Sequence, residues 1–147
     1  MPTFHFDDSN IRWNTLEGFE HLSCSILDID ERNGIIDVLF RFAANRQIVL
    51  HRHKALNHLL VIQGEHRLYH ADGRLKEIRP VGRYTVSPPS DEPHREGGGA
   101  EQDAVVFFSI RGDGLLYEIL GDDLQPIGTL GKEDFVVLYA AQQSAAK

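Results

Sequence analysis

The stretch "VLHRHKALNHLLVIQG", residues 49–64, holds the pattern that decides the fold. His51 and His53 stand two residues apart, ahead of the apolar run Leu59–Ile62 and of Gly64. In a β-strand, side chains at i and i+2 point to the same face, so these two imidazoles should project together. Two neighbouring imidazoles suit one metal ion, with metal–nitrogen distances of about 2.0–2.1 Å. We therefore expect a metal site on a strand, with a solvated histidine pair on a strand edge as the alternative.

A third ligand has to come from another part of the chain. His94 is the best placed of the remaining histidines, because it follows an expected strand, Gly82–Val86, and the turn "SPPSDEP". His58 alone is more typical of a satisfied polar residue near the start of a strand. The remaining histidines are interpreted as surface or fringe residues: His5, His21, His66 and His70.

Length, composition and charge restrict the class of protein. The 147 residues are the usual size of one domain, and 41% apolar residues suffice for a packed core. A net charge of −7 argues against a nucleic-acid partner and against an anionic membrane surface. Apolar runs are too short to span a bilayer, and no secretory signal is visible, so we expect a cytoplasmic protein. Cys24 is the only cysteine, which excludes a disulfide framework.

Short β-rich segments divided by turn residues predict an all-β fold. Such a series is typical of a sandwich or a barrel. We expect one domain over residues 1–147, with an N-terminal arm at about 1–22 and a barrel at about 23–138. Lys132–Ala141 is either a helix or a final strand, and the glycine-rich segment His94–Asp103 is expected to be a loop. The expected strands are Ser23–Ile29, Gly34–Phe42, Ile48–His53, His58–Ile62, Arg67–His70, Lys76–Ile78, Gly82–Val86, Ala104–Ile110, Leu115–Leu120 and Pro126–Thr129.

The flanks of the histidine pair resemble the first motif of the cupin superfamily. That motif is Gly, five residues, His-x-His, three or four residues, Glu, six residues, Gly. In this chain the corresponding positions hold Asn45, His51, His53, Asn57 and Gly64. Asparagine at the first position is a mild change, because asparagine also tolerates a left-handed φ.

The second cupin motif is also recognisable. It is Gly, five residues, Pro-x-Gly, two residues, His. Gly82 and Pro88 fit this pattern, Ser90 replaces the glycine, and His94 falls one residue late. The resemblance covers roughly residues 23–138. It implies a single small jelly-roll-type antiparallel β-barrel, with a metal held inside by the three histidines at positions 51, 53 and 94.

Asparagine at position 57 departs from most cupins, which carry a glutamate there. An amide oxygen is a weak ligand for a transition metal, so we expect a neutral three-histidine shell. Asn57 or His58 is the candidate fourth ligand, although strand alternation turns His58 to the other face. A cupin without this glutamate resembles the β-diketone-cleaving (acetylacetone) and dihydroxyacetophenone dioxygenases, which use a three-histidine Fe(II) centre. The segments "ILDIDERNGIIDVLFRF" and "RGDGLLYEILGDDLQPIGTL" resemble the same group.

This resemblance implies an oxidoreductase: an Fe(II) dioxygenase that cleaves a carbon–carbon bond of a β-diketone or acyl-phenol with O₂. Its metal ligands and catalytic residues would be His51, His53 and His94. A neutral shell leaves the ion its 2+ charge, which favours an anionic enolate. Zinc, nickel and manganese also accept three imidazoles. Alternate positions Leu59, Val61 and Phe107 would line an apolar substrate pocket, or would simply pack in the core.

Two other functions stay open. One is a non-catalytic metal-binding sensor or ligand-binding cupin of the ChrR type, a related neighbour. The other is a sugar- or small-molecule-binding barrel in which the histidines are incidental. As partners of the enzyme we expect a small-molecule substrate, O₂ and, because exposed strand edges favour pairing, a second copy in a homodimer.

Overall fold

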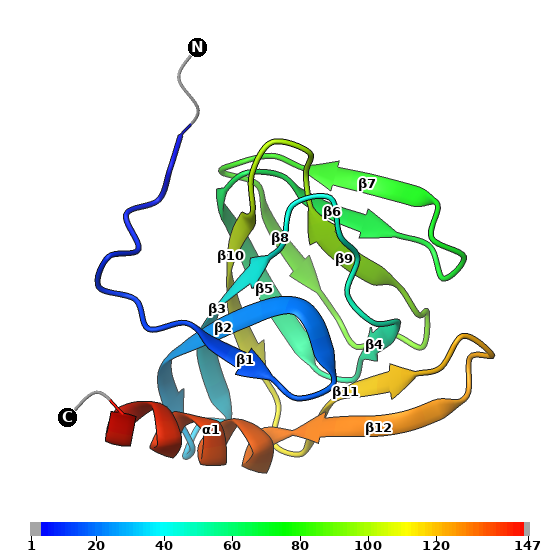
Figure 1. The fold of residues 1–147 in the computed structure, drawn as a ribbon. Coiled ribbons are helices and arrows are strands. Elements are labelled where there is room, and N and C mark those ends of the chain that lie inside the picture. The colour runs from blue at the N-terminus through cyan, green and yellow to red at the C-terminus, as the bar shows by residue number, and fades with distance from the viewer. Residues whose placement is uncertain (1–3, 146–147) are drawn as a thin grey trace.

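The computed structural model describes residues 4–145, which form β-strands followed by a helix (Figure 1). The prediction of an all-β fold with antiparallel sheets is confirmed. The elements are β1 (Asn14–Leu16), β2 (Phe19–Asp30), β3 (Ile35–Phe42), β4 (His51–His53), β5 (Leu56–Gln63), β6 (His66–Tyr69), β7 (Leu75–Arg79), β8 (Tyr84–Ser87), β9 (Arg95–Gly98), β10 (Ala104–Arg111), β11 (Leu115–Leu120), β12 (Pro126–Gly131) and α1 (Lys132–Ala145).

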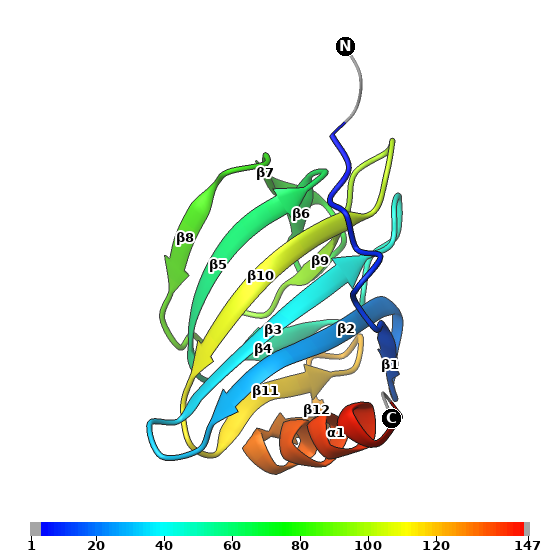
Figure 2. The same ribbon diagram turned by 90° about the vertical axis from the view of Figure 1, so that its left-hand side faces the viewer.

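The strands form three sheets around one interior. A six-stranded sheet has the order β1-β2-β3-β10-β5-β8, and two three-stranded sheets have the orders β12-β11-β4 and β7-β6-β9. Neighbouring strands in these sheets are antiparallel. The long strands of the six-stranded sheet curve over one side of the molecule, with β4, β6 and β9 behind them (Figure 2). The short strand β4 therefore presents its residues to the interior from the side opposite the large sheet.

The core lies on the inner face of the six-stranded sheet. On β10, Val106 and Phe108 are opposite Val61 and Leu59 of β5, and all four side chains are buried in one cluster. Phe107, between the two, points to the other face, opposite Leu60. Burying each such apolar side chain contributes about 1.5–3 kcal/mol, which fixes the register of the sheet.

The segment from Lys132 is a helix, which settles the choice between helix and strand. The backbone N–H of Gly131 donates to the Asp134 carboxylate at 2.7 Å, and acidic residues in the first turn complement the helix dipole. Phe135 is buried against the barrel. Gln142 accepts from the N–H of Ile26 at 3.0 Å and donates to its C=O at 2.8 Å, so the side chain satisfies backbone groups of β2.

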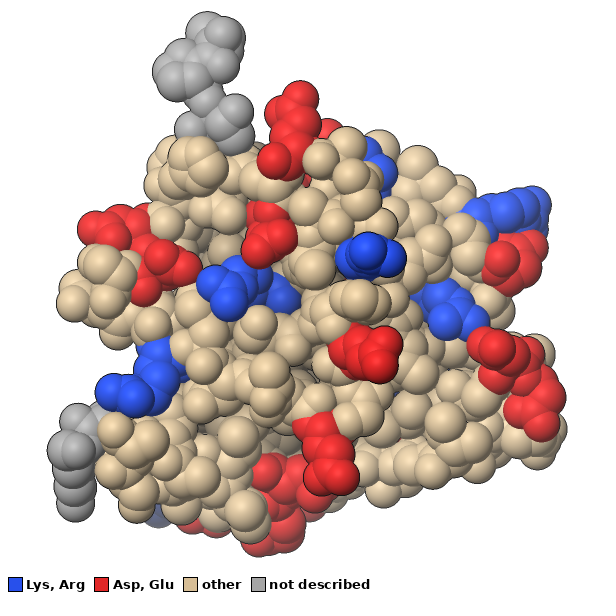
Figure 3. Space-filling view, in the orientation of Figure 1, with Lys and Arg blue, Asp and Glu red and all other residues tan. Residues whose placement is uncertain are grey.

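Two strands were not predicted from the sequence. β1 lies in the expected N-terminal arm and pairs with β2. β9 lies in the segment expected to be a loop, and most of it is buried. Basic and acidic side chains are interspersed on the face shown in Figure 3. Among residues 4–145, no helix has the length and apolarity that crossing a bilayer requires.

Candidate metal centre

The three histidines predicted as ligands come together inside the barrel. His51 and His53 point to the interior from β4 and are 2% and 5% exposed, while Arg52 between them points outward. His94 precedes β9 and forms an isolated antiparallel bridge with His51. The Nε2 atoms of His53 and His94 lie 3.1 Å apart. The structure thus brings together the three histidines that the sequence singled out. Metal binding by these residues stays a prediction.

A fourth side chain, Glu96, joins the cluster and was missed in the sequence. It lies on β9, two residues after His94, and is 3% exposed. Its Oε2 atom is 2.7 Å from His51 Nε2, 3.5 Å from His53 Nε2 and 3.4 Å from His94 Nε2. The possible ligand atoms of the four residues all lie within 4.8 Å of one another. The expectation of a shell without a carboxylate therefore does not describe this cluster.

The glycines after Glu96 explain how β9 reaches this position. A Cβ atom at Gly97 would lie 1.9 Å from the backbone oxygen of Arg46, and one at Gly98 would lie 2.7 Å from that of Phe42. Only glycine allows two backbones to approach so closely. The expected loop is therefore an ordered strand, whose glycines bring Glu96 against β4.

Asn57 and His58, the two candidates for a fourth ligand, lie outside the cluster. Asn57 is buried, donates to the C=O of Ala55 at 3.0 Å and accepts from the Tyr117 hydroxyl at 2.9 Å. His58 lies on the other face of β5, as strand alternation requires, and its ring contacts the Tyr84 hydroxyl. The carboxylate of the cluster is that of Glu96, which comes from a different strand.

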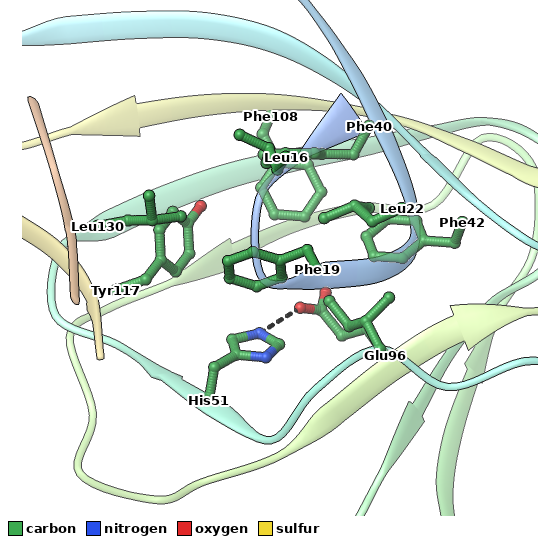
Figure 4. A pocket seen from close by; sticks show the side chains of 11 residues that line it. Leu16, Phe19, Leu22, Phe40, Phe42, His51, Glu96, Phe108, Tyr117 and Leu130 are labelled. Carbon is green, nitrogen blue, oxygen red and sulfur yellow. Dashed lines mark hydrogen bonds and ion pairs between the residues drawn. The ribbon is translucent and has the colours of Figure 1, made fainter. Parts of the chain in front are cut away.

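An apolar cavity adjoins the cluster, and both His51 and Glu96 face it (Figure 4). Its volume is about 20 Å³, which is room for about one water molecule. The remaining lining is apolar or aromatic: Leu16, Phe19, Leu22, Phe40, Phe42, Ile48, Phe108, Tyr117 and Leu130. The walls of the cavity therefore favour an apolar ligand beside a polar cluster.

The pocket residues predicted from the sequence lie elsewhere. Leu59 and Val61 are core residues and do not line this cavity. Phe107 is on the outward face of β10, and Phe108 lines the cavity in its place. The strand period of two holds on β10, but Phe108 is on the inner face and Phe107 is not. The sequence does not reveal which face is inner, because β10 is apolar on both faces.

The protonation states of the cluster suit metal binding. Burial lowers the pKa of His53 to about 4, against the opposing effect of its contact with Glu96. Burial also lowers the pKa of His94. Burial raises the pKa of Glu96, but hydrogen bonds from the surrounding imidazoles outweigh burial and hold that pKa well below its usual range. Metal ligands must be neutral imidazoles and ionised carboxylates, and these pKa shifts favour both.

The hydrogen bonds of His51 indicate a positive charge between its ring and Glu96. Its Nδ1 lies 2.8 Å from the C=O of Val49, which can only accept, so Nδ1 carries a proton. In the neutral ring the Nε2 lone pair then faces the ionised Glu96, 2.7 Å away. Two acceptors face one another unless a cation lies between them or the ring takes a second proton.

Several separations within the cluster are close to those between the ligands of a small divalent ion. Ligands at about 2.1 Å from a metal are separated by about 3.0–3.4 Å in octahedral or tetrahedral geometry. The three contacts of Glu96 and the contact between His53 and His94, at 2.7–3.5 Å, are close to that range, and all the ligand atoms lie within 4.8 Å of one another. Three imidazoles and a carboxylate accept iron, manganese, cobalt, nickel or zinc.

A sequence model described as "ChrR Cupin-like domain" matches residues 2–111 of the chain. The chain belongs to this family of cupins. The matched range includes all four clustered residues, and the cupin resemblance is confirmed. No curated protein matches this cupin.

Solved structures share the cupin fold at low sequence identity. An RmlC-like cupin protein from Ralstonia eutropha is 17% identical with a TM-score of 0.75, covering 99% of this chain and 89% of that one. An acetylacetone dioxygenase from Acinetobacter johnsonii is 12% identical with a TM-score of 0.70, covering 96% and 92%. ChrR, in its complex with SigE from Rhodobacter sphaeroides, is 20% identical with a TM-score of 0.55, covering 69% and 50%. The jelly-roll cupin fold predicted for this chain fits these neighbours.

Two residues of this region were missed in the sequence, Glu96 and His66, and only Glu96 could have been found from a sequence pattern. Glu96 follows His94 at the same i, i+2 spacing that selected His51 and His53, so reading "HREGGG" as a strand would have found it. His66 was interpreted as a fringe residue, yet it is fully buried and contacts Glu96. No spacing rule connects His66 to the motifs, because it comes from β6 in another sheet.

Proposed function

We propose that this cupin is a metal-dependent dioxygenase that cleaves a carbon–carbon bond of a β-diketone or acyl-phenol, with Fe(II) as the resident metal. The observation that carries this proposal is the buried cluster of three histidines and Glu96 beside an aromatic cavity. A divalent ion bound there would polarise two substrate oxygens and bring O₂ to the same place. The resemblance in fold to an acetylacetone dioxygenase supports the same reaction class.

The reaction balances without an external reductant. For a β-diketone, one carbon–carbon bond breaks and both atoms of O₂ enter the products, which are a carboxylic acid and a 1,2-dicarbonyl compound. One Glu96 carboxylate against a 2+ ion leaves a net positive site, which still attracts an enolate but less strongly than a neutral shell would.

The chain's own residues would bind the apolar part of the substrate and exclude water once the cavity has widened beyond its volume of about 20 Å³. Phe19, Phe40 and Phe108 supply aromatic walls. Tyr117 also lines the cavity; burial, and then the charge of Glu96, hold its pKa well above its usual range, so its hydroxyl stays protonated. That hydroxyl donates to Asn57, which fixes the ring beside His53 at a centroid distance of 5.1 Å.

The test is O₂ uptake by protein that has been loaded with Fe(II) under anaerobic conditions. We expect acetylacetone or an acyl-phenol to be consumed in a one-to-one ratio with O₂, and His53→Ala to abolish uptake. His58→Ala is the matched control, since this histidine lies outside the cluster, and it should retain activity. No uptake over a panel of diketones and acyl-phenols would remove this reaction class.

A second candidate function is a non-catalytic, metal-binding sensor cupin. The family match to the ChrR cupin-like domain favours it, and so does the small volume of the cavity. For a sensor we expect stoichiometric zinc binding, a rise in thermal stability when zinc binds, and no O₂ consumption. The same protein preparation, loaded with zinc or iron, therefore distinguishes the two candidates.

We also propose that the chain forms a homodimer through the outer face of the six-stranded sheet. Leu60, Tyr84 and Val86 lie on adjacent strands and are 38%, 56% and 51% exposed. An exposed apolar face on an edge strand is a site where a second copy can pack. Light scattering should give a dimer mass for the wild type and a monomer mass for Val86→Lys; a monomeric wild type would contradict this assembly.

A further inference from the structure

His66 is a buried histidine outside the set of candidate ligands that contacts one of them. It opens β6, is 0% exposed, and lies opposite Gly98 of β9. Its ring packs beside Phe42 at a centroid distance of 5.0 Å and Phe108 at 6.2 Å. A site between two phenylalanines would suit an apolar side chain, so packing alone does not explain a histidine here.

His66 makes its polar contact with Oε1 of Glu96, the carboxylate oxygen that does not face the other three histidines. His66 Nε2 lies 2.8 Å from Oε1, whereas His51, His53 and His94 all face Oε2. An ionised carboxylate can only accept, so the Nε2–H of His66 donates to it. The other ring nitrogen, Nδ1, is buried and has no hydrogen-bond partner among the described residues. The contact with Oε1 is therefore the one hydrogen bond of this ring among the described residues.

We propose that His66 is a positioning residue that holds Oε1 of Glu96 away from the cluster, so that the carboxylate offers a metal ion a single oxygen. This inference rests on the metal site of the proposed function. Because Glu96 is on a glycine-rich strand and its Oε2 contacts lie at one edge of the carboxylate, free rotation would let either or both oxygens face the histidines. The hydrogen bond from His66 selects one orientation, in the way that outer partners orient metal ligands in other sites.

The experiment measures cobalt(II) binding to the metal-free full chain, by chelator competition and by the visible absorption of the bound ion. We expect one Co²⁺ per wild-type chain. His66→Leu removes the donor and should weaken Co²⁺ binding by about 10–100-fold and shift the absorption bands. His66→Gln places an amide N–H near the former Nε2 and should restore affinity and spectrum most of the way. His70→Leu, a histidine outside the cluster, is the matched control and should leave both unchanged.

A double-mutant cycle separates positioning from structural damage. In a Glu96→Gln background the ionised oxygen is gone, so adding His66→Leu should change Co²⁺ affinity by less than about 3-fold. If His66→Leu does not fold, the more adaptable His66→Met takes its place in the cycle. A folded His66→Leu or His66→Met variant with wild-type Co²⁺ affinity and spectrum would overturn the inference. It would also be overturned if His66→Leu weakened Co²⁺ binding as much in the Glu96→Gln background as in the wild type. A wild-type chain that binds no Co²⁺ would instead refute the metal site itself, and the role of His66 with it.

Discussion

His51 and His94 exchange two backbone hydrogen bonds, from His51 N–H to His94 C=O at 3.0 Å and from His94 N–H to His51 C=O at 2.9 Å. Their rings meet edge to face at a centroid distance of 4.8 Å. The main chain therefore holds the two segments together in addition to the contact between the imidazoles. Through this bridge, Glu96 is also brought to the interior, two residues further along.

Removing one of the histidine rings should abolish metal binding, because a ligand is lost. The fold should remain, because the backbone hydrogen bonds stay in place. We expect His53→Ala and His94→Ala to lose stoichiometric zinc or iron and to keep the far-UV circular dichroism of the wild type, because the backbone bridge does not need the rings. Elemental analysis of purified protein checks the metal content. His58→Ala should keep its metal, and a loss of metal in that variant equal to the loss in His53→Ala would contradict the site.

Gly97→Ala should destabilise the protein strongly. The added methyl would lie 1.9 Å from the backbone oxygen of Arg46, so β9 must move away from the β3–β4 connection. Overpacking of this kind costs about 1–3 kcal/mol or more, and the movement should also weaken metal binding through Glu96. Urea unfolding gives the free energy. Gly114→Ala is the matched control, since a Cβ there meets nothing within 4 Å, and its stability should stay within about 1 kcal/mol of the wild type.

The part of the site that the sequence predicts consists of residues on recognisable strands. His51 and His53 sit beside an apolar run, so the strand period of two is enough to place both rings on one face. Asn45 takes the left-handed conformation, with φ at 58°, that its place in the first cupin motif implied. Strand alternation and the family motif were therefore sufficient to predict the placement of these residues.

Glu96 and His66 were not predicted from the sequence, for a physical reason. A run of three glycines is typical of a mobile loop, because glycine loses the most entropy on ordering. Here that cost is offset by the close approach of β9 to residues 42–47, a tertiary contact that local sequence does not encode. His66 depends on the same approach, since its partner Glu96 lies on β9.

Leu16→Ala should widen access to the cavity. Leu16, in the short strand β1, is half-buried and lines the cavity, which holds only about one water molecule as it stands. Leu16 is only partly buried where it packs against the core, so shortening this side chain should cost less stability than shortening a fully buried leucine would. We expect the activity on a bulky acyl-phenol to rise several-fold relative to acetylacetone, measured as the ratio of kcat/KM values. Leu115→Ala, at an exposed leucine away from the cavity, should leave that ratio unchanged.

Cys24 should be inert in the folded protein and should make stability fall in alkali. It is 0% exposed, and burial raises the pKa of its thiol to about 12 from the usual 9.0. Only the thiolate reacts, so a thiol reagent at pH 8 should label Cys24 in denaturant but not in the native state.

The unfolded chain loses the Cys24 proton near pH 9 while the folded chain keeps it until about pH 12. The contribution of the protonated thiol to the free energy of unfolding is therefore complete below pH 9. It declines between pH 9 and pH 12, and at pH 10 the free energy of unfolding is lower by about 1.4 kcal/mol. Cys24→Ala lacks this dependence but shares every lysine and tyrosine, so the difference between the two unfolding free energies at pH 8 and pH 10 isolates the thiol. Equal losses in both proteins, or rapid native labelling, would mean that the thiol is accessible to solvent.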